Sequence, residues 1–438
     1  MPAAHVIEAD LTWTGEGFER GVRVAVGDDG RIESVDNTSR KATKKLANHA
    51  LIPGMINVHS HAFQRGLRGH GETFPPSQGR SDFWAWRQAM YALVETLDVT
   101  RLHALCVQCF REMLAAGITT VGEFHYLHHD ASLKGFAFDA VVLRAAKDAG
   151  IRIVLIESFY RTGGIDKPLA GGQLRFRTDS VDEYWTQMDR LASMIERPTQ
   201  SLAASAHSIR AASIDEVVEL HQEATRRGLP FHMHVEEQPQ EIVDCVERYG
   251  SPPMALLNKR LDINPMFTAV HCTHTAGADM DEFLSRGGAV CINLLTEGNL
   301  GDGVPNVPRI LRGGASRIAL GSDSNARLCW TEEMRWLEYG QRLRSGTRGI
   351  VVNEQGECGR KLFECATVSG ARSLGLHAGR IAPGCVADFV ALDLTTPSLE
   401  GWTDQTLLDA FIFGTGNEAI REVCVGGQWI QETKRRRD

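Results

Sequence analysis

The chain has 438 residues, a formal net charge of −8 and a pI near 6.1. A chain of this length is too long for one small domain and can bury a large core. Its acidic balance argues against non-specific binding to nucleic acid. No apolar stretch reaches the roughly 18 residues that a membrane span needs, and the N-terminus MPAAHVIEAD lacks the features of a signal peptide. We therefore expect a cytoplasmic protein without nucleic-acid or membrane partners.

The ten cysteines are scattered, and most lie inside apolar runs. This distribution is typical of reduced core cysteines in a cytosolic protein. Cys106 and Cys109 form a single CxxC on a helix-like segment, with no second pair to complete a zinc knuckle. We expect both of them to be buried side chains.

The two ends of the chain have sequence patterns that are typical of short strands and tight turns. Residues 22–35 (VRVAVGDDGRIESV) predict two strands around an Asp-Asp-Gly turn. Residues 379–394 (GRIAPGCVADFVALDL) and 420–432 (IREVCVGGQWIQE) have the same pattern near the other end. We therefore expect the segments 1–53 and 376–438 to pack together as one small β-domain.

Between these ends, short apolar strands alternate with longer helical segments. One helix is expected after Ser213, which forms a capping-box pattern with Glu216, and Gly228 marks the end of that helix. The eight expected strands are 51–58, 118–124, 151–157, 201–206, 229–234, 266–270, 288–294 and 317–322. Eight strand–helix repeats predict an α/β fold, a (β/α)8 barrel over residues 54–375. A doubly wound sheet is the alternative, but no GxGxxG follows the first strand to mark a dinucleotide site.

The tripeptide His59-Ser60-His61 directly follows the apolar run LIPGMINV. Two histidines spaced i, i+2 on a strand point to the same face, so their nitrogens converge where the strand ends. Histidine combined with carboxylate suits zinc. Taken alone, the tripeptide fits a pair of ordinary loop histidines equally well.

Polar side chains that can bind a metal or transfer protons follow most of the other expected strands. Active sites of (β/α)8 barrels lie at these carboxyl ends. The residues are Glu123, His125 and Tyr126 after the second strand, His207 and Arg210 after the fourth, His232, His234 and Glu237 at the fifth, His271 after the sixth, and Asp323 after the eighth. Such a concentration predicts a catalytic metal site.

We expect one metal ion, held by His59, His61 and His234 as neutral nitrogen ligands and by Asp323 as the carboxylate. A second metal would need a bridging group, usually a modified lysine at the fourth strand, and no lysine lies near that strand end. Zinc is the expected metal, although iron or manganese also suits such ligands.

The expected chemistry is hydrolysis by a water molecule whose pKa the metal lowers toward about 7. Asp323 is placed to take its proton, and His271 orients or stabilises the hydroxide. Glu237, three residues past His234, is expected to pass the proton to a nitrogen leaving group. His232 is expected to be a packing residue. His274, and the loop residues His128 and His129, are expected to have no direct role.

The HxH, the HxxE at 234–237, the histidine after the sixth strand and the SD after the eighth resemble the deaminase branch of the amidohydrolase superfamily. The flanking β-segments are similar to the composite β-domain of that superfamily. Longer motifs resemble the N-formimino-L-glutamate deiminase family over nearly the whole chain: HSHAFQR (59–65), DFWAWR (82–87), EFHYLHHD (123–130), AHSIRA (206–211), HVEEQPQEI (234–242), TEGNLGDG (296–303), GSDS (321–324) and RWLEYGQRLR (335–344). This resemblance implies zinc-dependent hydrolysis of a formimino C=N bond in histidine degradation, which releases N-formyl-L-glutamate and ammonia.

The resemblance also implies roles for individual residues. It implies that the four residues already named bind the metal and that Glu237, His271 and Asp323 have catalytic roles. A glutamate-derived substrate has two carboxylates, which arginine binds bidentately. The implied substrate contacts are Gln64, Arg87, Tyr126, His207 and Arg210.

One departure from the family pattern leaves alternatives open. The family usually has histidine two residues beyond the strand-eight aspartate, and this chain has Asn325. The alternative substrate is another amidine or an aminated heterocycle, whose site should favour stacking aromatics over paired arginines. A hydrolase of amides or ring C–N bonds and a non-catalytic metal-binding protein are further alternatives. We expect a small-molecule substrate with carboxylates, and a homodimer, the commonest soluble oligomer.

Overall fold

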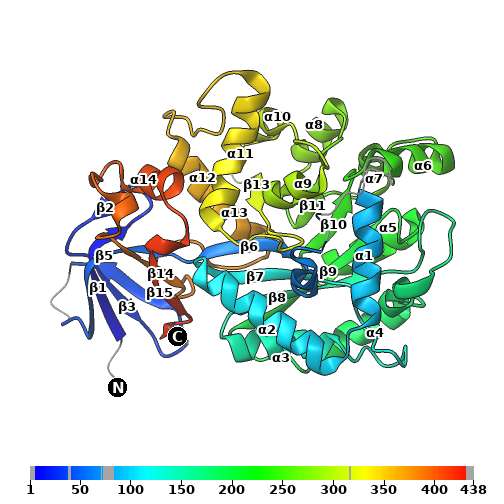
Figure 1. The fold of residues 1–438 in the computed structure, drawn as a ribbon, viewed down its shortest axis with the longest axis horizontal. Coiled ribbons are helices and arrows are strands. Elements are labelled where there is room, and N and C mark those ends of the chain that lie inside the picture. Colours follow the sequence, from blue (N-terminus) through cyan, green and yellow to red (C-terminus); the bar gives the residue numbers. More distant parts are fainter. Residues whose placement is uncertain (1–4, 38–40, 71, 73–82, 315–316, 431–438) are drawn as a thin grey trace.

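The computed structural model describes residues 5–37, 41–70, 72, 83–314 and 317–430. It contains a parallel barrel of eight strands and, beside it, a separate sheet built from both ends of the chain (Figure 1). The expected fold class, a (β/α)8 barrel with a composite β-domain, is confirmed. In the part of the chain that is described, no helix has the length and apolar character needed to cross a bilayer.

The barrel strands follow one another around the ring in chain order. They are β6 (Met55–Ser60), β7 (Ile118–His125), β8 (Arg152–Phe159), β9 (Gln200–Ser208), β10 (Phe231–Val235), β11 (Phe267–His271), β12 (Ala289–Ile292) and β13 (Ile318–Leu320). The ring closes just beyond β13, where the Ser322 amide donates to the His59 carbonyl at 3.0 Å and the His61 amide donates to the Asp323 carbonyl at 2.9 Å. Closure therefore joins the HxH segment directly to the SD segment, although about 260 residues separate them.

Helices cover the outside of the barrel. They are α2 (Val99–Ala115), α3 (Asp139–Ala149), α4 (Val181–Ala192), α5 (Ile214–Arg226), α6 (Pro239–Tyr249), α7 (Pro253–Arg260), α8 (Gly277–Ser285), α9 (Leu294–Leu300), α10 (Val307–Leu311), α11 (Trp330–Ser345), α12 (Cys358–Ala366) and α13 (Val368–Ser373). The capping box predicted for α5 is present, because the Ser213 side chain accepts from the Glu216 amide and the Glu216 side chain accepts from the Ser213 amide. Cys106 and Cys109 on α2 are buried and unlinked, as predicted.

Helix α1 (Phe83–Glu95) packs against two short 3-10 helices, η1 (Ala62–Leu67) and η3 (Gly171–Phe176). Phe83, Trp86, Arg87 and Met90 of this helix line a pocket at the carboxyl ends of the strands. One face of α1 therefore becomes part of the site.

The β-domain is one sheet with the order β16-β15-β14-β5-β1-β3-β4, and β2 pairs with β1. Its strands are β1 (His5–Trp13), β2 (Phe18–Glu19), β3 (Arg23–Val26), β4 (Ile32–Asp36), β5 (Lys44–Pro53), β14 (Phe389–Asp393), β15 (Ile420–Val425) and β16 (Gln428–Trp429). Helix α14 (Leu407–Gly414) and the 3-10 helices η4 (Pro397–Leu399) and η5 (Asn417–Ala419) lie between β14 and β15 in the chain. The predicted hairpin is β3–β4. Pairing of β14 with β5 joins the two ends of the chain in one sheet.

The expected strand 51–58 is wrong in one respect, since two sheets share this apolar run. Strand β5 ends at Pro53 in the β-domain, and β6 begins at Met55 in the barrel. Gly54 lies between them, and a Cβ atom at this position would be 2.1 Å from Thr119 Oγ1 on β7. The chain therefore passes from one sheet to the other at the residue where only glycine fits.

Candidate active site

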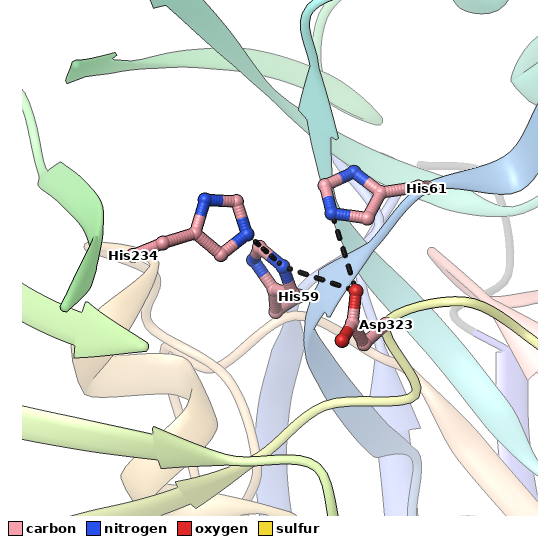
Figure 2. Close-up of side chains that lie close together, drawn as sticks. All are labelled: His59, His61, His234 and Asp323. Carbon is pink, nitrogen blue, oxygen red and sulfur yellow. Dashed lines mark hydrogen bonds and ion pairs between the residues drawn. The ribbon is translucent and has the colours of Figure 1, made fainter. Parts of the chain in front are cut away.

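Four buried side chains converge at the mouth of the barrel, and Figure 2 shows their arrangement. His59 and His61 come from the end of β6, His234 comes from β10, and Asp323 follows β13. His59 Nε2 lies 3.1 Å from His234 Nε2 and 3.6 Å from Asp323 Oδ1, and His61 Nε2 lies 3.2 Å from the same oxygen. The structure thus brings together the four residues that the sequence proposed as metal ligands.

Hydrogen bonds determine which imidazole nitrogens face the cluster. His61 Nδ1 donates to the Phe124 carbonyl at 2.8 Å, and His234 Nδ1 donates to the His207 carbonyl at 2.9 Å. Each ring therefore directs an Nε2 lone pair inward, which is the usual orientation of metal-binding histidines. Burial lowers the pKa of His59 to about 3 and that of His234 well below its ordinary value. Neutral imidazoles beside a carboxylate are a donor set that fits a divalent metal ion.

Asp323 is the ionised member of the cluster. Burial opposes a negative charge on this carboxyl, but contacts with His59 and His61 outweigh burial and hold its pKa well below the usual range. The backbone of Asp323 has φ +48°, and His271 has φ +72°. Left-handed backbone at residues other than glycine is uncommon and clusters at functional sites.

A second set of titratable groups lies next to the cluster. His271 Nε2 is 3.7 Å from both Glu237 Oε1 and Asp323 Oδ2, and its Nδ1 is 3.3 Å from Glu297 Oε1. Burial opposes a positive charge on His271, but Glu237 and Glu297 raise its pKa to about 10. Glu237, His271 and Asp323 are therefore close enough to exchange protons through one bound molecule.

The sequence motif TEGNLGDG was recognised, but no residue within it was assigned a role. Glu297 contacts His271, and Asp302 belongs to a buried group of potential ligands with Glu237 and His271. Burial raises the pKa of Asp302 to about 9, and the Gln238 side-chain amide donates to its Oδ1. Glu297 and Asp302 both follow the seventh barrel strand, and this position would have identified them from the sequence.

One pocket joins the metal-ligand cluster to all five residues proposed to contact substrate. Gln64 Nε2 donates to the Tyr126 hydroxyl at 2.7 Å, and Arg87 donates to the hydroxyls of Tyr91 at 2.5 Å and Tyr160 at 3.0 Å. The pocket is lined by His61, Gln64, Phe83, Trp86, Arg87, Met90, Tyr126, Tyr160, Phe176, His207, Arg210, His234, Glu237, Leu300 and Asp323. Sequence reasoning missed the apolar part of this lining, because α1 and η3 reach the barrel mouth only through tertiary packing.

Arg210 connects the two parts of the pocket. Its Nη2 donates to Glu237 Oε2 at 2.9 Å, and its Nε lies 3.6 Å from Glu241 Oε2. Its Nη1 is buried and has no hydrogen-bond partner in the described part of the chain. Burial opposes the guanidinium charge, but Glu241 and Glu237 raise the pKa of Arg210 further. A charged donor is therefore available at the pocket beside the proposed acid.

His207 is the neutral neighbour of the two arginines. Burial lowers its pKa well below the ordinary value, and the charges of Arg210 and Arg87 lower it further. Its Nδ1 lies 3.0 Å from the Ser208 hydroxyl. The lining of the pocket thus includes two positive groups and one uncharged ring, a combination that suits a carboxylate.

Asn325 lies behind the pocket, not in it. Its Nδ2 donates to Ser60 Oγ and to the carbonyls of His61 and Asp323, each at 3.1 Å, and its Oδ1 accepts from Ser322 Oγ at 2.6 Å. The side chain is fully buried. Asn325, the residue that departs from the family pattern, therefore supports the two segments that carry His61 and Asp323.

The histidines expected to have no direct role lie outside the pocket lining found among the described residues. His232 is fully buried, and its Nε2 donates to the Ser373 carbonyl at 2.9 Å, as expected for a packing residue. His129 Nε2 donates to the Arg177 carbonyl at 2.8 Å. His128 was expected in a polar loop, but it is fully buried among carboxylates, because η3 and α3 cover this loop.

Comparison with known proteins agrees with this architecture. The model of the Amidohydrolase family matches residues 50–430. The chain is 35% identical over 431 residues to a formimidoylglutamate deiminase of Pseudomonas aeruginosa, a match that covers 97% of this chain and 94% of that protein. It is 26% identical over 384 residues to a 5'-deoxyadenosine deaminase of Methanothermobacter thermautotrophicus, with 86% and 82% covered.

A solved structure supports the same assignment. The crystal structure of an amidohydrolase from Brucella melitensis matches with a TM-score of 0.86 and 30% identity, over 97% of this chain and 94% of that one. The chain therefore belongs to the amidohydrolase family, as a hydrolase of the deaminase type that acts on C–N bonds.

Proposed function

We propose that the protein hydrolyses the formimino C=N bond of N-formimino-L-glutamate to give N-formyl-L-glutamate and ammonia. The observation that supports this most directly is the buried, unpartnered Nη1 of Arg210, within the described residues, in a pocket that also contains Arg87. These two guanidiniums suit the carboxylates of a glutamate-derived substrate. The formimidoylglutamate deiminase of Pseudomonas aeruginosa, 35% identical over 97% of this chain, supports the same substrate.

Zinc is the metal proposed for the cluster of His59, His61, His234 and Asp323. Three nitrogen ligands and one carboxylate suit zinc, and iron or manganese is the alternative. When bound, zinc lowers the pKa of water and polarises the C=N bond. The inward lone pairs of His61 and His234 are the feature of the chain that fits such an ion.

Residues of the chain itself bind the substrate and transfer the protons. Arg210 Nη1 and Arg87 bind carboxylate, and this contact positions the formimino carbon near Asp323. Asp323 accepts a proton from the attacking water, and His271, 3.7 Å away, stabilises the charge that develops on oxygen. Glu237, held by Arg210 Nη2, donates a proton to the substrate nitrogen. Asp323 then passes its proton to the same nitrogen and the added hydroxyl returns a proton to Glu237. The C–N bond breaks, ammonia leaves, and oxygen from water remains on the formyl group.

The test is ammonia release from the zinc-loaded protein with N-formimino-L-glutamate. A kcat/KM above about 10⁴ M⁻¹s⁻¹, the low end for ordinary enzymes, is expected. Asp323→Asn is expected to lose turnover while the circular dichroism spectrum stays unchanged. Absence of ammonia from a preparation with confirmed metal content would refute the assigned substrate.

Deamination of an aminated heterocycle is the second candidate. Phe83, Trp86 and Tyr160 line the pocket and offer aromatic surface, and the 5'-deoxyadenosine deaminase relative matches 86% of the chain. The discriminating measurement is ammonia release from 5'-deoxyadenosine by the same preparation. Arg87→Met, at a guanidinium that bonds Tyr91 and Tyr160, should strongly lower activity on the formimino compound and spare activity on a heterocycle, which has no carboxylate.

A further inference from the structure

Glu241 on α6 is a buried carboxyl beside the pocket that has no assigned role. It lies in the motif HVEEQPQEI (234–242), and the residue is 1% exposed. Its Oε1 accepts from the Glu236 amide at 3.3 Å, and its Oε2 lies 3.6 Å from Arg210 Nε. Oε2 has no hydrogen-bond partner in the part of the chain that the structure describes. Glu241 is therefore an acid that faces Arg210 without a direct bond to it.

Arg210 already lies between two acids. Its Nη2 donates to Glu237 Oε2 at 2.9 Å, and its Nε faces Glu241. All three residues are at most 6% exposed. A substrate carboxylate at Arg210 Nη1 would add a third negative charge around one guanidinium. Because unbalanced charge is costly in a buried site, binding of that carboxylate favours uptake of a proton by one of the two acids.

Glu241 is the acid that the contacts favour for this proton. Arg210 holds the Glu237 carboxylate with a direct charge-assisted hydrogen bond, and such a bond stabilises the ionised form. The same guanidinium reaches Glu241 only at 3.6 Å. Arg210 therefore opposes protonation of Glu241 less strongly than protonation of Glu237.

The surroundings of Glu241 bring its titration into the neutral pH range. Burial raises its pKa to about 7, the charge of Arg210 opposes this rise, and Glu237 and Glu236 add to it. Cys245, one turn further along α6, is a further titratable neighbour, and burial raises the pKa of its thiol to about 12. Glu241 therefore changes its charge near neutral pH, whereas Cys245 stays uncharged there.

We propose that Glu241 is a positioning residue that takes up one proton from solution when a substrate carboxylate binds at Arg210. The new O–H bond removes the charge of Glu241, so the guanidinium pairs with Glu237 and with the substrate. The neutral carboxyl keeps its contact with the Glu236 amide, which holds the side chain in place. This inference rests on the proposed function, which assigns a substrate carboxylate to Arg210. Carboxylate affinity should be constant below about pH 7 and should fall up to about tenfold per pH unit above it.

The test is calorimetric titration of the zinc-loaded protein with N-acetyl-L-glutamate, a dicarboxylate that has an amide in place of the C=N bond. Measurements at one pH in buffers of different ionisation enthalpy give the number of protons taken up per ligand. Wild-type protein should take up close to one proton at pH 8 and close to none at pH 6. Glu241→Gln keeps the acceptor for the Glu236 amide and should lose the uptake at pH 8. At pH 8 this variant should bind about tenfold more tightly than wild type, because glutamine has no charge to neutralise.

Asp244 on the same helix provides the matched control. Its carboxylate accepts from Gln240 Nε2 at 2.7 Å in an exposed bond, so Asp244→Asn should keep the proton uptake. Equal uptake in wild type and Glu241→Gln would place the proton on another group and overturn the proposal. Absence of binding by the wild-type protein, or of uptake at pH 8, would overturn it without any variant. Ammonia release from N-formimino-L-glutamate is measured separately, so failure of the assigned reaction is distinguished from failure of this inference.

Discussion

Single residues of this site make more than one functional contact, and Arg210 is the clearest example. One guanidinium nitrogen donates to Glu237, and another is buried without a partner within the described chain. The same side chain is therefore expected to bind the substrate carboxylate and to position Glu237, the proposed acid. This double contact predicts that its loss changes both steady-state constants.

Arg210→Lys keeps the positive charge but removes the planar fork of donors. We expect KM for N-formimino-L-glutamate to rise at least about tenfold and kcat to fall at least about tenfold, because the lost contacts correspond to charge-assisted hydrogen bonds. Initial-rate measurements separate the two constants. Arg65→Lys, at a partly exposed ion pair with Glu112, is the control and should leave both constants unchanged. A rise in KM alone would show that Arg210 does not position Glu237.

Glu123 predicts a pH dependence of stability. Its Oε1 accepts from the Ala62 amide at 2.5 Å, and burial raises its pKa to about 8. An unfolded glutamate loses its proton near pH 4.3, so between that value and about pH 8 only the folded state holds the proton. The stabilisation is therefore complete below pH 4.3, decreases by at most about 1.4 kcal/mol per pH unit, and levels off above pH 8.

Glu123→Gln removes this titration and keeps an acceptor for the Ala62 amide. The difference in melting temperature between wild type and variant should shift in favour of the variant from pH 5.5 to pH 8, and it should be constant from pH 8.5 to pH 9.5. Thermal unfolding in one buffer series of constant ionic strength measures it. A difference that does not vary with pH would show that Glu123 is ionised in the folded state.

At the scale of elements, the ends of the barrel strands position the side chains of the site. The junction between β5 and β6 positions β6, the first strand of the barrel. The run that crosses this junction is apolar throughout, yet it serves two sheets. Gly54 is the only residue between them, and its amide donates to the Asp388 carbonyl at 2.9 Å. Packing of Thr119 against this glycine therefore determines how β6 enters the barrel.

Gly54→Ala should destabilise the protein by about 1–3 kcal/mol, since a methyl group would overlap the Thr119 side chain on a packed strand. The expected signature is a lower melting temperature. Gly17→Ala is the matched control, because no atom in the described structure lies within 4 Å of a Cβ atom at that position. Equal melting temperatures for the two variants would mean that β7 moves aside without cost.

At the scale of the whole molecule, a buried ion pair joins the β-domain to the barrel. Arg152 at the start of β8 donates through Nε and Nη2 to both oxygens of Asp388, at 2.8 and 2.9 Å. Asp388 also accepts from the Gly426 amide at 2.7 Å. Because Arg152 begins its strand, this contact lies at the end of the barrel opposite the active site.

Asp388→Asn should lower the free energy of unfolding by about 3–5 kcal/mol, because it leaves a buried guanidinium without its counter-charge. Denaturant unfolding measures this loss. Activity per folded molecule should stay unchanged, since the pair is remote from the pocket. Lys147→Met removes one partner of an exposed pair with Glu196 and should leave the free energy of unfolding nearly unchanged. A loss of similar size in both variants would contradict the coupling of the two units.

The sequence by itself determined the barrel, because periodic strands and helices and the polar residues at strand ends are local patterns. It also placed His59, His61, His234 and Asp323 in one group, since the carboxyl ends of barrel strands meet by construction. Only the tertiary structure decided how these side chains are used. The bond between Arg210 and Glu237, the bonding of Asn325 behind the pocket, and the meeting of His128 with Glu157 all join residues distant in the chain. No local pattern encodes such contacts, because they arise from packing between elements whose separation in the chain carries no periodic signal.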